Sequence, residues 1–187
     1  MSDTFPPQFL KDAVDLLEKD GFRTSDVWYH GTASGLAESI MTQGLIGGGD
    51  TETAQREQNT LGTIGNRQFA AADPVYLTQS RELALYWAIE TTHRRNMFFQ
   101  KNEFPLVLRV DMTGVEVKPD AGAAAIAIEP GNNYMEALKL TYKEAGIDFP
   151  EDINPMKIDR DFYLKKLGMA YSADAIPAER LSVVRPD

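Results

Sequence analysis

The chain has 187 residues, of which 43% are hydrophobic and 25% charged, and this balance is typical of one folded domain rather than of a disordered segment. The formal net charge of −9 disfavours nonspecific binding to nucleic acid, because the mean field of the protein repels phosphate, and it favours protein or small-molecule partners. The absence of cysteine excludes disulfides and thiolate chemistry, and with two histidines no metal site is expected.

The first 26 residues predict an N-terminal helical extension. Two prolines precede apolar residues spaced three or four apart, and the pattern ends at Gly21. No basic region followed by an apolar run marks a signal peptide, and no stretch reaches the ~20 apolar residues that span a membrane. We therefore expect a cytoplasmic protein without a membrane partner, or one exported by a specialised secretion system that needs no such signal.

The next elements are a strand, a helix and a long loop. Aromatic and β-branched residues at 27–30 predict a strand that Gly31 stops, and a helix over 33–43 follows, with Gly44 at its C-terminal end. From 47 to 74 glycines and polar residues dominate, over a length that a simple connection does not need. We expect a long mobile loop that acts as a lid over a ligand.

The middle of the chain predicts a strand, a helix and a second strand. Val75–Thr78 has the composition of a short strand, and Ser80 is positioned to cap a following helix that carries Tyr86. The basic residues 93–95 suit the C-terminal end of that helix, and we expect them to be solvated, with an anion contact as the alternative. Pro105–Asp111 alternates only partly, as expected of a central strand that is covered on both faces.

The C-terminal part predicts two more helices and two more strands. Apolar spacing favours helices over 134–145 and 162–167, each followed by a glycine, and strands over Met169–Ser172 and 182–184. Residues 121–128 are small and apolar, and the pattern leaves them open between a strand and a loop wall. Together these elements predict an α+β fold in a single domain of residues 1–187.

A set of five residues carries the parts of a nicotinamide nucleotide site. His30, Gly31 and Thr32 place an imidazole beside free backbone groups at a strand end, and Tyr76 and Tyr86 offer flat rings on a second strand and a helix. Such groups can hold a ribose hydroxyl, an amide and an aromatic ring together. Taken alone, each residue is more often structural, since buried histidines and tyrosines are common in cores, but their order favours a site.

The ordered set resembles the ADP-ribosyltransferases of the diphtheria-toxin and poly(ADP-ribose) polymerase type, whose site is often called His-Tyr-Glu. The matching parts are the strands, helices and long loop from about Trp28 to Val184, including the turn at Ile176 and Pro177. The resemblance implies an α+β fold with a split, strongly curved β core and surrounding helices. It also implies a nicotinamide slot between two half-sheets, with NAD bound as the substrate in a compact conformation.

The resemblance assigns a role to each residue of the set. It implies that His30 hydrogen-bonds the adenosine ribose, that the Gly31 backbone pairs with the nicotinamide amide and that Thr32 lines the same corner. Tyr76 corresponds to the family's central tyrosine, and Tyr86 to the second ring that sandwiches nicotinamide. By this resemblance His30 and Tyr76 are catalytic residues, and all five residues bind NAD.

The chain departs from the family at the third residue of the motif. The family's glutamate begins the strand before the Ile-Pro turn, whereas residues 168–171 here are Gly, Met, Ala and Tyr. Asp174 and Glu179 lie beyond this strand and Glu129 lies in another segment, so the sequence assigns the role to none of them. Cleavage of NAD passes through an oxocarbenium-like cation that a carboxylate stabilises, yet a few family branches transfer a single ADP-ribose without that acid.

We predict an NAD-dependent mono-ADP-ribosyltransferase-like protein, serving as a toxin, an effector or a housekeeping enzyme. A protein acceptor is favoured over nucleic acid because the surface is acidic. The alternatives are an NAD glycohydrolase, an RNA 2′-phosphotransferase, whose basic groove a net charge of −9 disfavours, and a noncatalytic NAD-binding or interaction module. In the long loop, Arg56 and Arg67 are candidate contacts to the NAD diphosphate, and the alternative is that they are solvated surface residues.

Overall fold

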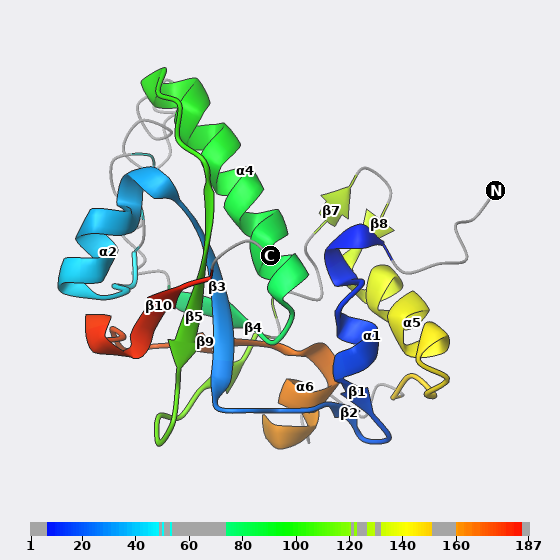
Figure 1. The fold of residues 1–187 in the computed structure, drawn as a ribbon. Coiled ribbons are helices and arrows are strands. Elements are labelled where there is room, and N and C mark those ends of the chain that lie inside the picture. Colours follow the sequence, from blue (N-terminus) through cyan, green and yellow to red (C-terminus); the bar gives the residue numbers. More distant parts are fainter. Residues whose placement is uncertain are drawn as a thin grey trace, which may run out of the picture.

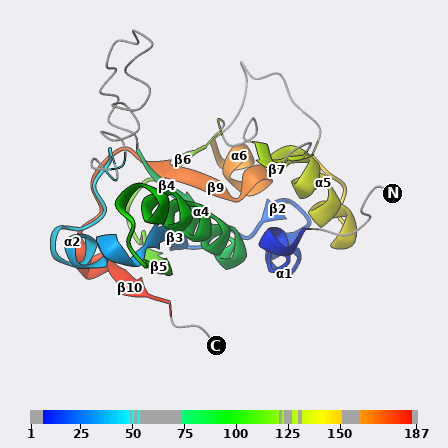
Figure 2. The same cartoon turned by 90° about the horizontal axis from the view of Figure 1, so that it is seen from above.

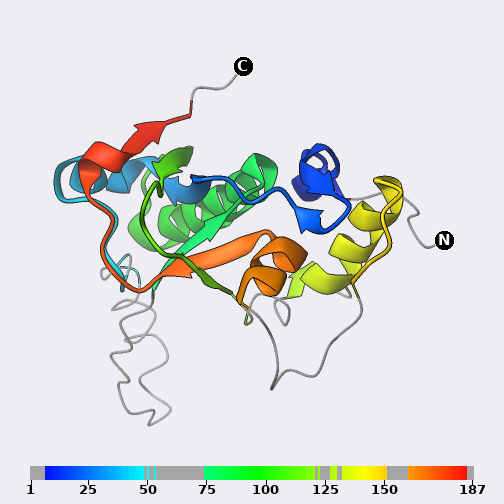
Figure 3. The same ribbon diagram turned by 90° about the horizontal axis from the view of Figure 1, so that it is seen from below.

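The computed structural model describes residues 7–48, 50, 53, 74–120, 122, 127–129, 132–150 and 160–184, and its fold is α+β, as the sequence predicts (Figure 1). A six-stranded antiparallel sheet forms the centre, and the long helix α4 (Arg81–Phe99) packs against it. Helix α2 (Ala37–Gln43) and strand β10 (Leu181–Val183) lie at one end of the molecule. Helices α1 (Ala13–Leu16) and α5 (Tyr134–Glu144) lie at the other end (Figures 2 and 3).

The central sheet has the strand order β10-β5-β3-β4-β9-β6. Besides β10, its strands are β3 (Val27–Ala33), β4 (Val75–Thr78), β5 (Pro105–Asp111), β6 (Lys118–Pro119) and β9 (Met169–Ser172). β3 pairs with β5 along its whole length, and β4 pairs with β9 along its whole length. Within the described residues, however, β3 and β4 are joined at a single residue pair, Tyr29 and Thr78. In the part of the chain that the structure describes, this sheet can thus be divided into two half-sheets, β10-β5-β3 and β4-β9-β6, that meet at that pair.

The other described elements are shorter and lie around the sheet. They are the 3-10 helices η1 (Gln8–Leu10), η2 (Ser34–Leu36) and η6 (Ala178–Arg180), helix α6 (Arg160–Leu167), and the strands β1 (Leu17–Glu18), β2 (Gly21–Phe22), β7 (Ala127–Glu129) and β8 (Asn132–Asn133). β1 pairs with β2, and β7 pairs with β8. Part of the segment that the sequence leaves open, residues 127–128, thus belongs to a strand.

Two predicted helix boundaries are confirmed by local geometry. Ser80 caps α4, because its hydroxyl accepts a hydrogen bond from the Leu83 N–H at 3.0 Å. Helix α2 ends at Gly44, whose φ of 89° lies in a region that side chains with a Cβ atom rarely adopt. Cap and turn residues act on their immediate neighbours, which explains why the sequence alone locates these boundaries.

Gly31 does not end strand β3, contrary to the prediction. The strand continues to Ala33, and Gly31 instead lets helix α4 approach the strand. A Cβ atom at position 31 would lie 2.0 Å from the carbonyl oxygen of Ala84 and 2.7 Å from the nitrogen of Ala88. Both distances are far inside van der Waals contact. The missing side chain is therefore a packing requirement between strand and helix rather than a stop signal.

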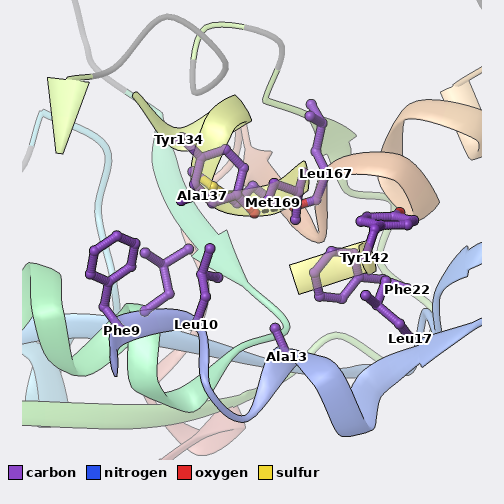
Figure 4. Packing of buried hydrophobic residues seen from close by; sticks show 12 residues of the cluster. Phe9, Leu10, Ala13, Leu17, Phe22, Tyr134, Ala137, Tyr142, Leu167 and Met169 are labelled. Carbon is purple, nitrogen blue, oxygen red and sulfur yellow. Dashed lines mark hydrogen bonds between the residues drawn. The ribbon is translucent and has the colours of Figure 1, made fainter. Parts of the chain in front are cut away.

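The N-terminal segment is not the continuous helical extension that the sequence predicts. Only Ala13–Leu16 is α-helical in its described part, and the chain then forms the β1-β2 hairpin. The apolar residues of this segment pack against α5 and the end of α6 (Figure 4). The core that they form includes Phe9, Leu10, Phe22, Tyr134, Leu138, Tyr142 and Leu167. The apolar spacing thus reflects burial of a helix and a hairpin in one core, and the segment is an integral part of the domain.

Helix α4 is longer than predicted. It continues through the basic residues 93–95 to Phe99 and ends at Gln100, which adopts the left-handed conformation with a φ of 52°. Arg95 is 2% exposed, so it does not belong to a solvated helix end. The basic residues 93–95 therefore differ in environment: His93 and Arg94 are exposed, whereas Arg95 is buried.

Asp12 ties the N-terminal segment to the start of α4. Its carboxylate accepts hydrogen bonds from the Ser80 hydroxyl at 2.6 Å and from the backbone N–H groups of Arg81 at 2.7 Å and Glu82 at 3.3 Å. The helix dipole also favours negative charge at this end.

We predict that Asp12→Ala lowers the free energy of unfolding by about 1–2 kcal/mol, measured by urea denaturation. Asp15→Ala, at an exposed position of the same segment, should change it by less than about 0.5 kcal/mol. Equal effects of the two substitutions would contradict the anchoring role.

Candidate functional site

A cavity of about 600 Å³ lies between the two half-sheets, just beyond the residue pair that joins them. Strand β3 contributes His30, Gly31 and Thr32 to its wall, and β4 contributes Val75 and Tyr76. The rest of the wall comes from α2, from the segment that follows α2, and from the C-terminal half of α4. Small-molecule and cofactor sites typically have volumes of roughly 300–1,000 Å³, so the cavity can hold a ligand of cofactor size.

Four of the five predicted site residues line this cavity: His30, Gly31, Thr32 and Tyr76. They come together because β3 and β4 separate beyond the pair of Tyr29 with Thr78, so that residues on either side of the gap face each other. Thr32 is buried, whereas Tyr76 is 48% exposed. An accessible ring in a cavity wall is suited to stacking on a planar ligand.

Tyr86 is not among the described residues that line the cavity. Its ring lies against Phe9 at a centroid distance of 5.2 Å and against Trp87 at 5.1 Å, beside the N-terminal core. Helical geometry explains this placement, since Ala84 faces β3 and a residue two positions further along is rotated by about 200° around the helix axis. Of the two tyrosines expected to sandwich nicotinamide, only Tyr76 is therefore among the described residues that line this cavity.

His30 bridges the two half-sheets through a hydrogen bond. Its Nδ1 atom lies 2.8 Å from the carbonyl oxygen of Tyr76. Because a carbonyl oxygen can only accept, Nδ1 carries the proton, and Nε2 of the neutral ring is an acceptor. Burial lowers the pKa of His30 below its ordinary value and outweighs the opposing effect of this hydrogen bond. At neutral pH the ring is therefore uncharged and can accept a hydrogen bond from a hydroxyl group.

The wall formed by α4 contains an ion-pair cluster that sequence reasoning missed. The Arg95 side chain is 3% exposed, and it contacts Glu103 at two points, Nε to Oε2 at 2.6 Å and Nη2 to Oε1 at 3.0 Å. The remaining nitrogen, Nη1, donates to the Asp50 carboxylate. The hydrogen bond with Glu103, helped by that with Asp50, outweighs burial and raises the pKa of Arg95, so the guanidinium stays charged. The prediction of a solvated helix end is therefore wrong for Arg95.

Asp50 is the one carboxylate among the described residues that line the cavity. Its side chain is 14% exposed, and it accepts hydrogen bonds from the Thr53 N–H at 3.1 Å, from the Thr53 hydroxyl and from Arg95. Burial alone would raise the pKa of Asp50, but these hydrogen bonds outweigh burial and lower it. The carboxylate is therefore ionised at neutral pH.

Strand β9, where the resemblance places a glutamate, contains no acidic residue. Its Tyr171 pairs with Tyr76 of β4, so the strand neighbours the cavity wall without bringing a charge to it. Asp174 and Glu179 are exposed and are not among the described lining residues, and the side chain of Glu129 lies outside the described part of the chain. The negative charge of the cavity therefore comes from the segment after α2.

Comparisons of the chain with protein-family models, with curated proteins and with solved structures give no significant match. In the described residues, no group of three or more His, Asp or Glu side chains is placed to hold a metal ion, and no helix combines the length and hydrophobicity needed to cross a membrane. Most of the predicted lid, including Arg56 and Arg67, lies outside the described residues. The geometry of the cavity therefore carries the functional interpretation.

The lowered pKa of His30 predicts a loss of stability in mild acid. The unfolded chain protonates a histidine near pH 6.5, whereas the folded protein resists protonation down to a lower pH. Between these two values the unfolded state binds more protons, so the free energy of unfolding falls as the pH decreases. His30 accounts for at most about 1.4 kcal/mol per pH unit of this fall.

Substitution of each of the two histidines tests this prediction. We expect His30→Gln to reduce the fall in stability, and His93→Gln, at an exposed position of α4, to leave it unchanged. Chemical denaturation at several values between about pH 7 and pH 5 measures the difference. The same pH dependence in both variants would show that the fold does not favour the neutral form of His30.

Proposed function

We propose that the chain is an NAD-dependent mono-ADP-ribosyltransferase-like enzyme, which cleaves the bond between nicotinamide and ribose and transfers ADP-ribose to a protein. The observation that carries this proposal is the hydrogen bond from His30 Nδ1 to the Tyr76 carbonyl within the cavity. It brings together the histidine and the tyrosine of the His-Tyr-Glu resemblance. It also leaves the imidazole with an acceptor nitrogen in a wall that contains an accessible aromatic ring.

The cavity offers three kinds of contact that suit NAD. Nε2 of His30 can accept a hydrogen bond from a ribose hydroxyl, the backbone at Gly31 can pair with the carboxamide, and the ring of Tyr76 can stack on nicotinamide. Binding at three points holds the dinucleotide in one orientation, which lowers the barrier to attack at the ribose carbon. Cleavage moves the electron pair of the glycosidic bond onto the nicotinamide nitrogen, and a nucleophile of the acceptor then bonds to that carbon.

The architecture of the sheet supports the same proposal. A fold of the ADP-ribosyltransferase type is expected to have a β core split into two half-sheets with the nicotinamide slot between them. Here the halves β10-β5-β3 and β4-β9-β6 meet at one residue pair within the described residues, and the cavity lies beside that pair. The position of four residues of the set, His30, Gly31, Thr32 and Tyr76, in the wall of this cavity supports the proposal.

A protein acceptor suits the surface around the cavity. Ile46 and Tyr76 line the cavity and are 53% and 48% exposed, and Met41 on the neighbouring helix α2 is 41% exposed. Exposed apolar side chains of this kind favour contact with another protein. The buried arginine of the cavity, Arg95, is paired with two carboxylates, which disfavours a role in holding RNA phosphates. The RNA 2′-phosphotransferase alternative is therefore less well supported.

A noncatalytic NAD-binding module is the second candidate function. It is favoured by the absence of an acid from strand β9 and by the position of Tyr86 away from the cavity. Release of nicotinamide distinguishes an enzyme from such a module. Transfer of labelled ADP-ribose to protein distinguishes a transferase from a glycohydrolase, in which water is the acceptor.

We predict that NAD raises the melting temperature of the protein by mass action. At a free NAD concentration of one hundred times the Kd, binding adds about 2.7 kcal/mol to the free energy of unfolding. Tyr76→Ala should weaken binding by about 1–3 kcal/mol, because the stacking contact is lost, and His30→Ala should weaken it because the hydroxyl loses its acceptor. Scanning fluorimetry at several NAD concentrations measures the shifts.

Tyr86→Phe is the control for these substitutions, since Tyr86 packs beside the N-terminal core and is not among the described lining residues. This variant should keep the NAD-dependent rise in melting temperature. A wild-type protein that NAD fails to stabilise, or an equal rise in Tyr76→Ala, would refute the binding site.

A further inference from the structure

The cluster of Asp50, Arg95 and Glu103 is the part of the cavity wall that the proposed function leaves unexplained. Asp50 and Arg95 line the cavity, and Glu103 binds the guanidinium from the protein side. The side chains of Arg95 and Glu103 are 3% and 6% exposed, whereas that of Asp50 is 14% exposed. The cluster is therefore buried in the wall, with Asp50 as its most accessible group.

Arg95 and Glu103 form a rigid support for Asp50. The Glu103 N–H donates to Asn96 Oδ1 at 2.8 Å, and Asn96 Nδ2 donates to the Glu103 carbonyl at 2.9 Å. Gly35 allows the carboxylate to come close, since a Cβ atom there would lie 2.1 Å from its Oε1. Because Nε and Nη2 of Arg95 both bind Glu103, the guanidinium is held in one orientation with Nη1 directed at Asp50.

The cluster contains more negative charge than the burial of Arg95 requires. Glu103 alone neutralises the guanidinium through its two-point contact. A neutral oxygen would satisfy the remaining Nη1 donor, but the chain places a second carboxylate, Asp50, at that position. Within these three side chains, one cation and two anions leave one net negative charge, and their low exposure weakens screening by solvent. Lys101 acts on the buried Glu103 rather than on Asp50, and the cation Arg94 lies at an exposed position of the cavity wall. This surplus charge faces the cavity.

We propose that Asp50 is a catalytic residue whose carboxylate stabilises the positive charge that develops on the ribose when NAD is cleaved. This inference rests on the proposed function. The nicotinamide ring of NAD is cationic, and when the bond from C1′ to N1 breaks, the electron pair passes to N1 and the positive charge moves to the ribose. A fixed carboxylate stabilises this transition state more than the bound substrate, which accelerates cleavage. The acceptor nucleophile then gives an electron pair to C1′ and releases its proton to solvent.

The same surplus charge disfavours a diphosphate at this part of the cavity. A phosphate group would approach a net negative cluster, and displacement of Asp50 would expose a guanidinium that Glu103 already neutralises. Of the other described lining residues, Arg94 is charged but exposed, and His30 is uncharged at neutral pH. The cluster therefore suits the ribose next to nicotinamide, where positive charge develops during cleavage, rather than the diphosphate.

The test compares Asp50→Asn with Asp50→Glu in the full chain, using kcat for nicotinamide release and the Kd for NAD from calorimetry. Asp50→Asn should lower kcat about 100-fold and change the Kd by less than about threefold, because the charge acts mainly on the transition state. Asp50→Glu keeps the charge and should retain at least about tenfold more activity than Asp50→Asn. Both substitutions disturb the contacts with Thr53 and Arg95, so a purely structural role would lower both activities alike.

Asp111→Asn is the matched control. Asp111 accepts hydrogen bonds from the N–H and the hydroxyl of Thr113 at 2.9 and 2.6 Å, as Asp50 does from Thr53, but it is not among the described lining residues. This substitution should leave kcat unchanged. Melting temperatures verify folding, and Asp50→Ser, which is also neutral, replaces Asp50→Asn if the latter does not fold.

Two results would overturn the role of Asp50 and leave the proposed function standing. One is an unchanged kcat for nicotinamide release in Asp50→Asn. The other is an equal loss of kcat in Asp50→Asn and Asp50→Glu. The absence of nicotinamide release by the wild-type protein would overturn both the proposed function and this inference.

Discussion

The contact between helix α4 and strand β3 at Gly31 is the constraint on which the rest of the site depends. The two backbones touch there because Gly31 has no Cβ atom. This contact sets the rotation of the helix about its axis, so that residues three or four positions apart, Ala84, Ala88, Thr91 and Arg95, are directed toward the strand and the cavity. The opposite side of the helix packs on the N-terminal core, so α4 couples the stability of that core to the shape of the cavity.

The gap between β3 and β4 is possible because a side chain replaces a missing backbone contact. In a continuous sheet the Tyr76 carbonyl and its neighbours would pair with the adjacent strand, and a carbonyl left without a partner in the interior is costly. Here the strands separate after the pair of Tyr29 with Thr78, and His30 donates its Nδ1 proton to that carbonyl instead. The same hydrogen bond determines which imidazole nitrogen accepts, so the opening of the sheet and the polarity of the cavity have one cause.

Local signals predicted much of the fold, whereas long-range contacts limited the prediction of the site. Strand β4 has the predicted bounds because its residue types act locally. Gly31 was misread because a glycine that ends a strand and a glycine that admits a distant helix look alike in sequence. Tyr86 packs beside the N-terminal core because the rotation of α4 is set by that contact, which local sequence does not reveal. The spacing of Arg95 along the inner face of α4 was a usable signal, but Asp50 lies in a polar, glycine-rich stretch whose sequence has no periodicity.

The charges around the cavity are separated by structural element, and burial explains why. The strands contribute neutral groups, His30, Thr32 and Tyr76, since a buried charge on a strand would need its own partner within the sheet. The surplus negative charge belongs to the cluster of Asp50, Arg95 and Glu103, where the long side chain of Arg95 on α4 reaches both carboxylates. One wall therefore offers hydrogen bonds and a ring, and the other offers a fixed anion. A substrate that complements both walls must present hydroxyl and aromatic groups to the first and develop positive charge beside the second as it reacts. The nicotinamide riboside part of NAD offers the hydroxyl groups and the ring, and its ribose becomes cationic during cleavage, so the proposed substrate agrees with the charge pattern of the cavity as well as with its size.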